Sequence, residues 1–592
     1  MGLDVTIIEG APFSGKTTRL MEEIQDAIES GFDPADMAVF AASPSAAQDL
    51  GRRLADLGIP VTTTVPREHF LQLLADDEAR AITGRIPRLM LPFEYDFFLE
   101  DLKTSGLKPR RLREILKFFY RGMADGDSAH EDWLVTNEER ELMALISDTL
   151  AFTGAMLEAE VSPLVVRALR EGATLRSRST IPLVFVDDYA LLSRTTQEAL
   201  VLLSGERLVV TDGVEGVESF EAYPNGEGTA QLAAWFSAAR IVELGEVSLP
   251  ARQEEVVEAE TVVREMTAVA RLASQALQDG CAPWDMVVAA EHPAWRRNIA
   301  RVLESSGVRA ALVPSTAFLR CDVRREAGSA AARLATVLAL AANARDGVAW
   351  RAWCGFGDYL ANSNGFRSLC QRGRNGGLAA VLQAGELQPD LLDGLDAMGS
   401  IRRIEIAHQQ GEALLARLAG LEGDALLRAA MDEVEGPDAA IPAALLACAL
   451  PEGAQDASAA AMVERLRQAA FFPRFATSEA VRVGSFGQIA GLAPRVLVIA
   501  GAMNGFFPKA DLFDGTVLTV DQRQRRAEAA ERVARAVRAR ASERVVLTLT
   551  AQLPLEDAER LGLVVERIAL VDGQRMARLE PSMYLAERTQ AE

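Results

Sequence analysis

The chain has 592 residues and a formal net charge of −22, and hydrophobic residues make up 49% of it. This balance is typical of globular proteins, so it excludes a disordered or fibrous chain, and the length allows about four domains. The acidic charge argues against a protein that coats nucleic acid without specificity, although a local basic groove is compatible with it.

The N-terminal segment has the pattern of a phosphate-binding loop. Apolar residues at 5–8 predict a short buried strand, residues 10–17 read G-x-x-x-x-G-K-[ST], and residues 18–28 have the spacing of a helix. A chance match at a glycine-rich turn would not explain the strand before the loop and the helix after it. We therefore expect a nucleoside triphosphate to bind here.

The residue types in this loop indicate their roles. Gly10 and Gly15 allow the backbone to turn so that N–H groups face the phosphates. Lys16 is expected to bind the β- and γ-phosphates and Thr17 to ligate Mg²⁺. Only five lysines stand against 57 arginines, so each retained lysine is of interest. The expected nucleotide-binding residues are Gly10, Ser14, Gly15, Lys16, Thr17 and Thr18.

The region after the loop domain is predicted to be mainly helical, at residues 92–102, 112–123 and 137–157. Within it, segment 103–121 combines three of the five lysines with several arginines and with aromatic residues 118–120. Two interpretations remain open. The segment either contacts the backbone and bases of DNA, with Arg110 and Arg111 as candidates, or forms a solvated amphipathic helix whose aromatic side chains pack in the core.

An acidic pair follows the next apolar run. Residues 181–186 predict a buried strand that ends at Asp187 and Asp188. After a phosphate-binding loop, one carboxylate at such a strand end is expected to hold Mg²⁺ and its neighbour to orient or deprotonate a water molecule. The alternative is a strand followed by an ordinary acidic turn. About 170 positions separate Lys16 from Asp187, which leaves room for an inserted domain.

Two later regions are also predicted to be helical. The Ala/Leu-rich region 323–479 includes helical patterns at 330–342 and 439–450. Residues 523–544 predict an arginine-rich helix whose arginines cannot all face one side, so most are expected to be solvated or paired with nearby glutamates.

Cysteine and hydropathy patterns indicate a cytoplasmic protein. The five cysteines contain no C-x-x-C pair, which argues against a disulfide scaffold, and the four scattered histidines give little support for a zinc site. No apolar run approaches the ~18 residues of a membrane-spanning helix, and the N-terminus lacks the pattern of a secretory signal. We therefore expect no membrane association.

Taken in order, these patterns resemble superfamily 1A DNA helicases of the UvrD/Rep/PcrA type and the related AddB/RexB and RecB proteins. The block 496–508, which ends in N-G-F-F-P, is the most specific match after the phosphate-binding loop. It disfavours a third interpretation, an unrelated P-loop kinase or stress ATPase. The matching segments are 8–18, 40–47, 186–198, 208–212, 284–308, 481–508 and 531–548.

The resemblance implies an α/β fold with two RecA-like P-loop domains, each with a parallel sheet and a mainly helical insertion, the 1A/1B/2A/2B plan. The implied divisions are 1–86 with 179–245 for domain 1A, 87–178 for 1B, 250–322 with 480–555 for 2A, 323–479 for 2B, and 556–592 for a C-terminal extension of a strand or two and a frayed tail.

The resemblance also implies ATP and Mg²⁺ as ligands and single-stranded or 3′-tailed DNA as partner, in DNA repair or recombination. Thr17 and Asp187 would hold the metal, and Asp188 would activate water. Arg540 would sense the γ-phosphate. Ser43 and Ser485 would contact phosphates of the single strand.

The chain departs from the family pattern where hydrolysis is coupled to movement. Asp188 replaces a glutamate and is one methylene shorter, a displacement of roughly 1 Å that weakens water activation. Ala190 replaces the glutamine of V-D-E-x-Q-D, Glu215 lies near the expected glutamine after G-D, and Ala490 and Ala493 replace the lysine and glutamate of K-G-L-E.

These departures favour an alternative to a motor. In it, the chain is a catalytically degenerate helicase that binds ATP and DNA as a structural or scanning subunit of an AddAB/RexAB-like complex. Its partner would then be an AddA/UvrD-like helicase-nuclease subunit. The C-terminal nuclease of AddB-type proteins, with its cysteine cluster, is not expected in this chain.

Overall fold

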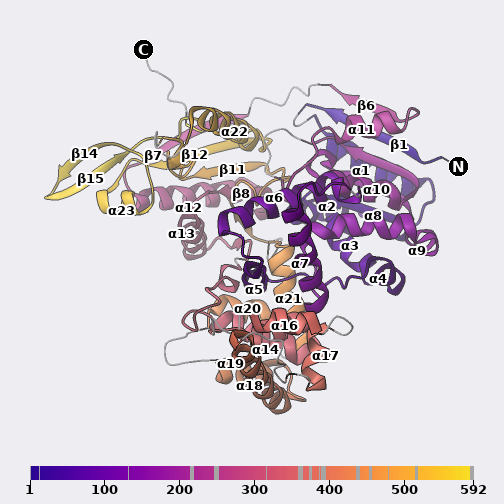
Figure 1. Ribbon diagram of the computed structural model, residues 1–592. Coiled ribbons are helices and arrows are strands. Elements are labelled where there is room, and N and C mark those ends of the chain that lie inside the picture. The colour runs from indigo at the N-terminus through magenta and orange to yellow at the C-terminus, as the bar shows by residue number, and fades with distance from the viewer. Residues whose placement is uncertain are drawn as a thin grey trace.

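The computed structural model of the chain has two α/β units side by side, each built on one parallel sheet, and a helical region below them (Figure 1). It describes residues 2–11, 14–130, 132–213, 219–245, 252–314, 316–357, 364–372, 377–385, 387, 395–434, 441–451, 456–475, 477, 479–513 and 518–586. Glu215, which the sequence places near the glutamine expected after G-D, lies outside these residues.

The first sheet has six parallel strands in the order β3-β2-β4-β5-β1-β6. Its strands are buried on both faces, which explains their nearly continuous apolar sequences. On β4, Leu183 and Phe185 pack on the side of α1 and α2, whereas Val184 and Val186 face the opposite core. The strands are β1 (Asp4–Gly10), β2 (Met37–Ala41), β3 (Thr63–Thr64), β4 (Ile181–Asp187), β5 (Ser204–Thr211) and β6 (Arg240–Leu244).

The helices around this sheet come from three parts of the chain. Although α8 and α9 fall inside the predicted insertion 87–178, α8 packs against α3, α4 and α10 of the first domain. The packing of α8 therefore does not coincide with the domain boundary predicted at residue 178. That boundary stays a prediction. These helices are α1 (Lys16–Glu29), α2 (Pro44–Asp56), α3 (Pro66–Leu74), α4 (Asp77–Thr83), α8 (Val161–Glu171), α9 (Ala173–Ser179), α10 (Arg194–Leu203) and α11 (Gly228–Trp235).

The second sheet also has six parallel strands, in the order β7-β12-β11-β8-β10-β9. Its strands are β7 (Gln253–Ala259), β8 (Met286–Ala289), β9 (Ala310–Leu312), β10 (Val481–Gly484), β11 (Val496–Ala500) and β12 (Arg544–Thr550). Its helices are α12 (Val262–Gln278), α13 (Pro293–Ser305) and α22 (Val520–Arg538). A three-stranded antiparallel sheet follows, with α23 (Leu555–Arg560) and strands β13 (Gln552–Pro554), β14 (Val565–Val571) and β15 (Gln574–Leu579).

The two insertions are helical. The first contains α5 (Pro92–Leu102), α6 (Pro109–Asp125) and α7 (Asn137–Thr153). The second lies at the bottom of Figure 1 and contains α14 (Ala330–Ala342), α15 (Gly347–Trp353), α16 (Asn364–Arg372), α17 (Gly377–Ala384), α18 (Leu395–Leu418), α19 (Gly423–Val434), α20 (Ala443–Ala449) and α21 (Ala459–Phe471).

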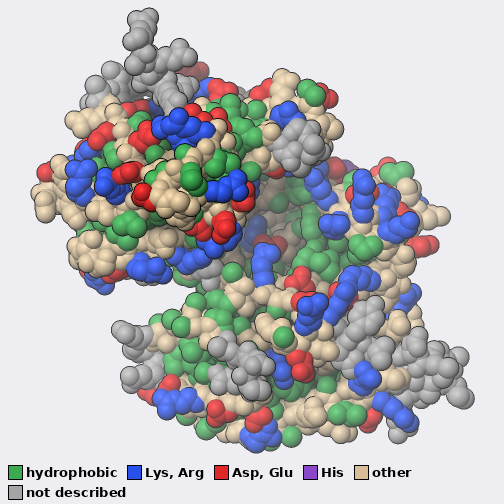
Figure 2. Space-filling model, turned by 90° about the vertical axis from the view of Figure 1, so that its left-hand side faces the viewer, with side chains coloured by type: hydrophobic (Ala, Val, Ile, Leu, Met, Phe, Trp, Pro, Cys, Tyr) green, Lys and Arg blue, Asp and Glu red, His purple; other side chains and the backbone are tan. Residues whose placement is uncertain are grey.

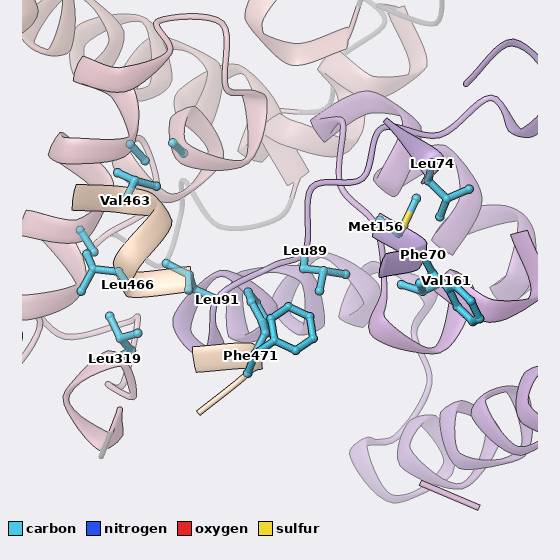
Figure 3. Close-up of a cluster of buried hydrophobic side chains, with 14 of the residues drawn as sticks. Phe70, Leu74, Leu89, Leu91, Met156, Val161, Leu319, Val463, Leu466 and Phe471 are labelled. Carbon is cyan, nitrogen blue, oxygen red and sulfur yellow. The ribbon is translucent and has the colours of Figure 1, made fainter. Parts of the chain in front are cut away.

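A shared hydrophobic core joins the second insertion to the first insertion and the first domain. Figure 3 shows Leu89 and Leu91 of the first insertion beside Leu466 and Phe471 of α21. The same cluster continues through Met156 to the helices of the first sheet. Burial of apolar surface is the main stabilising contribution to folding, so these modules stabilise one another.

Several predicted helices have different ends, and the one predicted at 112–123 is longer, because α6 runs from Pro109 to Asp125. The helix predicted at 137–157 stops at Thr153, because Gly154 adopts a left-handed conformation with φ of +71°. The helix predicted at 523–544 is wrong at both ends, since α22 runs from Val520 to Arg538 and β12 begins at Arg544. Within the segment predicted at 439–450, the described helix is α20, and residues 439 and 440 lie outside the description.

The chain is thus an α/β protein with two six-stranded parallel sheets and a small antiparallel sheet, which is consistent with two RecA-like domains. Within the described ranges, no helix has the length and apolarity needed to cross a lipid bilayer.

Candidate nucleotide-binding site

The glycine-rich loop lies at the carboxyl end of β1, where β1 ends at Gly10 and α1 begins at Lys16. Gly15 has a φ of +91°, a conformation that glycine adopts without a steric penalty. A Cβ atom on Gly10 would lie only 2.4 Å from Ser14 Oγ. That hydroxyl is buried and has no hydrogen-bond partner among the described residues, so the loop fits a group that supplies one, such as a phosphate.

Lys16 is buried and held at the mouth of this loop. Its Nζ donates to the carbonyl oxygen of Gly10 at 2.6 Å and forms an ion pair with Asp212 Oδ1 at 2.8 Å. Asp212 directly follows β5, the neighbour of β1, and its other oxygen accepts from the Gly10 N–H at 3.4 Å. A nucleotide phosphate would offer the same two donors a second negatively charged partner.

Thr17 and Asp187 meet beside the loop, as the sequence predicts. The Thr17 hydroxyl donates to both carboxylate oxygens of Asp187, at 3.0 and 3.2 Å. Burial raises the pKa of Asp187 above its ordinary value, although hydrogen bonds from Thr211 and Thr17 oppose this shift. A hydroxyl and a carboxylate at the end of a phosphate-binding loop are the oxygen ligands that Mg²⁺ prefers, so these residues fit the ion.

Asp188 follows at the same strand end, and its Oδ2 lies 3.8 Å from the position that a Cβ atom on Gly491 would take. It is a non-glycine residue in the left-handed region, with φ of +57° and ψ of +45°. Burial, followed by repulsion from Asp187, raises the pKa of Asp188 to about 7, although Arg540 and Lys16 oppose the shift. A carboxyl group that titrates near neutrality suits a general base.

Arg540 reaches this site from the second domain. It is buried, and its Nη1 donates to the carbonyl oxygen of Leu492 at 3.4 Å. Burial lowers the pKa of Arg540 to about 10, and attraction to Asp188 opposes this shift. The neighbouring Gly491 is tightly packed, because a Cβ on it would lie 2.5 Å from the Cβ of Ala46. The two domains therefore meet directly over Asp188.

The two predicted single-strand contacts occupy different environments. Ser43 is buried, caps α2 by accepting from the Ala46 N–H at 3.1 Å, and donates to the Ala490 carbonyl oxygen at 3.3 Å. Its hydroxyl therefore joins the two domains in this conformation. Ser485 is half-buried, and its hydroxyl accepts from the Gln488 N–H at 3.3 Å. Contact of either serine with DNA stays a prediction.

In the basic segment 103–121, both candidate DNA-contacting arginines are paired with carboxylates. Arg110 pairs with Glu114 on the same helix, and Arg111 pairs with Glu138 of α7. The aromatic side chains mostly match the amphipathic-helix interpretation, since Phe119 is buried. Tyr120 is half-buried and hydrogen-bonded to the Tyr95 hydroxyl. Phe118 is 41% exposed and stacks on Trp133, so it remains available at the surface.

A cavity of about 780 Å³ lies where the first domain, the first insertion, Thr316 and Arg320 ahead of the second insertion, and the end of α21 meet. Sequence reasoning missed it, because its lining comes from segments far apart in the chain. Arg67 lies over the ring of Phe220, 5.2 Å from its centroid, and pairs with Glu158. Other lining residues are Tyr95, Asp96, Tyr120, Glu221, Tyr223, Arg320 and Phe471. Figure 2 shows a hollowed face on which Lys and Arg side chains gather beside hydrophobic ones.

No protein-family model matches the chain, and no curated protein matches it.

Proposed function

We propose that the chain is a cytoplasmic, UvrD-like helicase or helicase-like protein that binds ATP and Mg²⁺ between two RecA-like domains and acts on single-stranded DNA. One observation supports this most. Lys16, Thr17, Asp187 and Asp188 of the first domain lie together, and Arg540 of the second domain is close enough to Asp188 to influence its carboxylate electrostatically. A chance glycine-rich turn would not assemble these groups from three distant segments.

Each group has a role in phosphoryl transfer to water. Lys16 would hold the β- and γ-phosphates once it leaves Asp212, and Thr17 with Asp187 would hold the metal ion. The bound ion would neutralise charge on the phosphate oxygens. Asp188 would accept the proton of the attacking water, and Arg540 would stabilise the negative charge that develops on the transferred group.

The cavity supports the DNA part of the proposal. Unpaired bases stack on aromatic side chains, and its lining contains five of them, together with Arg67 and Arg320. Arg110 and Arg111, by contrast, are exposed but already paired with carboxylates. We therefore propose the cavity, rather than the exposed surface of α6, as the binding site of the single strand.

A second candidate, the catalytically degenerate subunit of an AddAB/RexAB-like complex, is favoured by the contact between the domains. Asp49 of α2 is buried and accepts from Trp284 Nε1 at 3.0 Å and from Arg482 Nη1 at 2.7 Å in the second domain. Separating these domains would leave buried charges unpaired, which costs several kcal/mol. A module that holds ATP without large movements needs no such separation, and an AddA/UvrD-like partner would supply the motor.

ATP hydrolysis by the purified protein, with and without single-stranded or 3′-tailed DNA, tests the two candidates. Lys16→Ala is the informative variant, and Lys509→Ala, an exposed lysine of the second domain, is its control. Hydrolysis that DNA stimulates and that depends on Lys16 supports the motor. Lys16-dependent ATP binding without turnover supports the subunit, and absence of ATP binding by the wild-type protein contradicts both.

A further inference from the structure

Thr211 lies between the two aspartates of the site. It is the last residue of β5 and is fully buried beside β4. Its hydroxyl donates to Asp187 Oδ1 at 2.8 Å and accepts from the backbone N–H of Asp188, also at 2.8 Å. One side chain from a neighbouring strand thus engages two consecutive residues of the candidate site.

We propose that Thr211 is a positioning residue that holds the Asp187 carboxylate toward Thr17 and the Asp188 carboxylate toward Gly491 of the second domain. This inference rests on the proposed function, because it assigns Thr211 to the nucleotide–Mg²⁺ site. The hydroxyl acts only through the aspartates and does not itself bind the ligand.

The backbone of Asp188 shows why such a contact is needed. Residues other than glycine seldom adopt the left-handed conformation, and they keep it only where surrounding contacts over-determine it. The hydrogen bond from the Asp188 N–H to Thr211 is one such contact. Without it, a return of Asp188 to the common right-handed region would swing its carboxylate away from Gly491 and Arg540.

The second bond acts on the metal-binding carboxylate. Asp187 is held from one side by the Thr17 hydroxyl and from the other by the Thr211 hydroxyl. A carboxylate fixed by two hydroxyl donors is oriented before the ion binds, and loss of outer contacts of this kind typically weakens metal affinity 10- to 100-fold.

The residue type at this position departs from the V-V-G-D strand pattern of the helicases that residues 208–212 resemble. The V-V-G-D pattern that residues 209–212 resemble has glycine where Thr211 stands. Glycine has no hydroxyl and makes neither bond. Thr211 therefore adds contacts that the pattern itself does not supply.

Equilibrium binding of a fluorescent ATP analogue across a Mg²⁺ titration tests the proposal without requiring turnover. We expect Thr211→Val, and likewise Thr211→Gly, to raise the Mg²⁺ concentration for half-maximal binding about tenfold, and Thr211→Ser to stay within about twofold of wild type. Thr336→Val, a change at a fully buried threonine of α14, controls for general loss of a buried hydroxyl.

The outcomes separate this inference from the proposed function. If folded Thr211→Val and Thr211→Gly proteins require no more Mg²⁺ than wild type, Thr211 has no positioning role, whatever Lys16→Ala shows. If Thr336→Val weakens binding as much, the effect is one of stability and the inference is wrong. If wild type does not bind the analogue at any Mg²⁺ concentration, the proposed function fails and the inference fails with it.

Discussion

At Asp188, the ionised carboxylate that the proposed chemistry requires is also the form that destabilises the folded protein. Asp188 is half-buried beside Asp187 in a left-handed turn, and desolvation together with repulsion from Asp187 raises its pKa to about 7 from the ordinary 3.8. Between those two values the folded protein binds a proton that the unfolded chain has released. The free energy of unfolding therefore falls as the pH rises from about 4 to 7, and Asp188 destabilises the fold most above pH 7.

Replacement of Asp188 by asparagine should therefore stabilise the nucleotide-free protein at pH 8. One pKa unit corresponds to about 1.4 kcal/mol, so we expect a gain of about 2 kcal/mol or more in the free energy of unfolding. Chemical denaturation at pH 5 and pH 8 measures it, and the gain should be smaller at pH 5.

The same variant should lose any Lys16-dependent ATP turnover, because asparagine cannot accept a proton from water. In the wild-type protein, turnover should rise from pH 6 to pH 8 as Asp188 ionises. Asp36→Asn, at an exposed carboxylate, should change neither property. Equal stability of Asp188→Asn and wild type at pH 8 would contradict the raised pKa.

At the scale of elements, buried ion pairs fix the second insertion to the first. Arg351 of α15 forms two hydrogen bonds with Asp101 of α5, at 2.7 and 2.9 Å, and both residues are buried. The guanidinium also lies over the rings of Phe97 and Phe366. Arg88 makes a second link, with Asp346 at 2.9 Å. The sequence offered no signal for these pairs, whose partners lie about 250 positions apart.

Arg351→Ala should be strongly destabilising, because it leaves the Asp101 carboxylate buried without its partner. We expect a loss of about 3–5 kcal/mol in the free energy of unfolding, measured by urea denaturation. Arg417→Ala breaks an exposed pair with Glu433 on a neighbouring helix and should cost less than about 1 kcal/mol. A loss of about 1 kcal/mol or less for Arg351→Ala would show that its pair with Asp101 is not structurally important.

At the scale of the whole molecule, the contact around Asp49 joins two sheets that could each have a core of its own. Arg482 is 1% exposed and lies over the ring of Trp284, 4.2 Å from its centroid, while both side chains donate to Asp49. Gln48 adds two hydrogen bonds to the backbone of Phe475. The domains are therefore coupled through a buried polar cluster as well as at the nucleotide site.

We expect the wild-type protein to unfold in one calorimetric transition and Asp49→Ala to unfold in two, because the variant leaves Arg482 buried without its acidic partner at the domain contact. Asp56→Ala, on an exposed position of the same helix, is the matched control. Two transitions in wild type would mean that the cluster does not couple the sheets. A single transition in Asp49→Ala would mean that other contacts suffice.

Local patterns determined much of this protein. Residues 4–10 form a strand and residues 16–29 a helix because apolar spacing and helix-forming residues act over a few positions. The other parallel strands follow from apolar runs such as 181–187. The position of Asp187 and Asp188 at the carboxyl end of a buried strand was predictable for the same reason, because the apolar run stops there.

Only the tertiary structure decided which distant groups meet. It paired Lys16 with Asp212, placed Thr211 between the two aspartates, and turned the Ser43 hydroxyl to Ala490. It also packed α8 against α3, α4 and α10 beside the first sheet. Such contacts depend on strand order and side-chain packing between segments hundreds of positions apart, and neither quantity has a local period in the sequence.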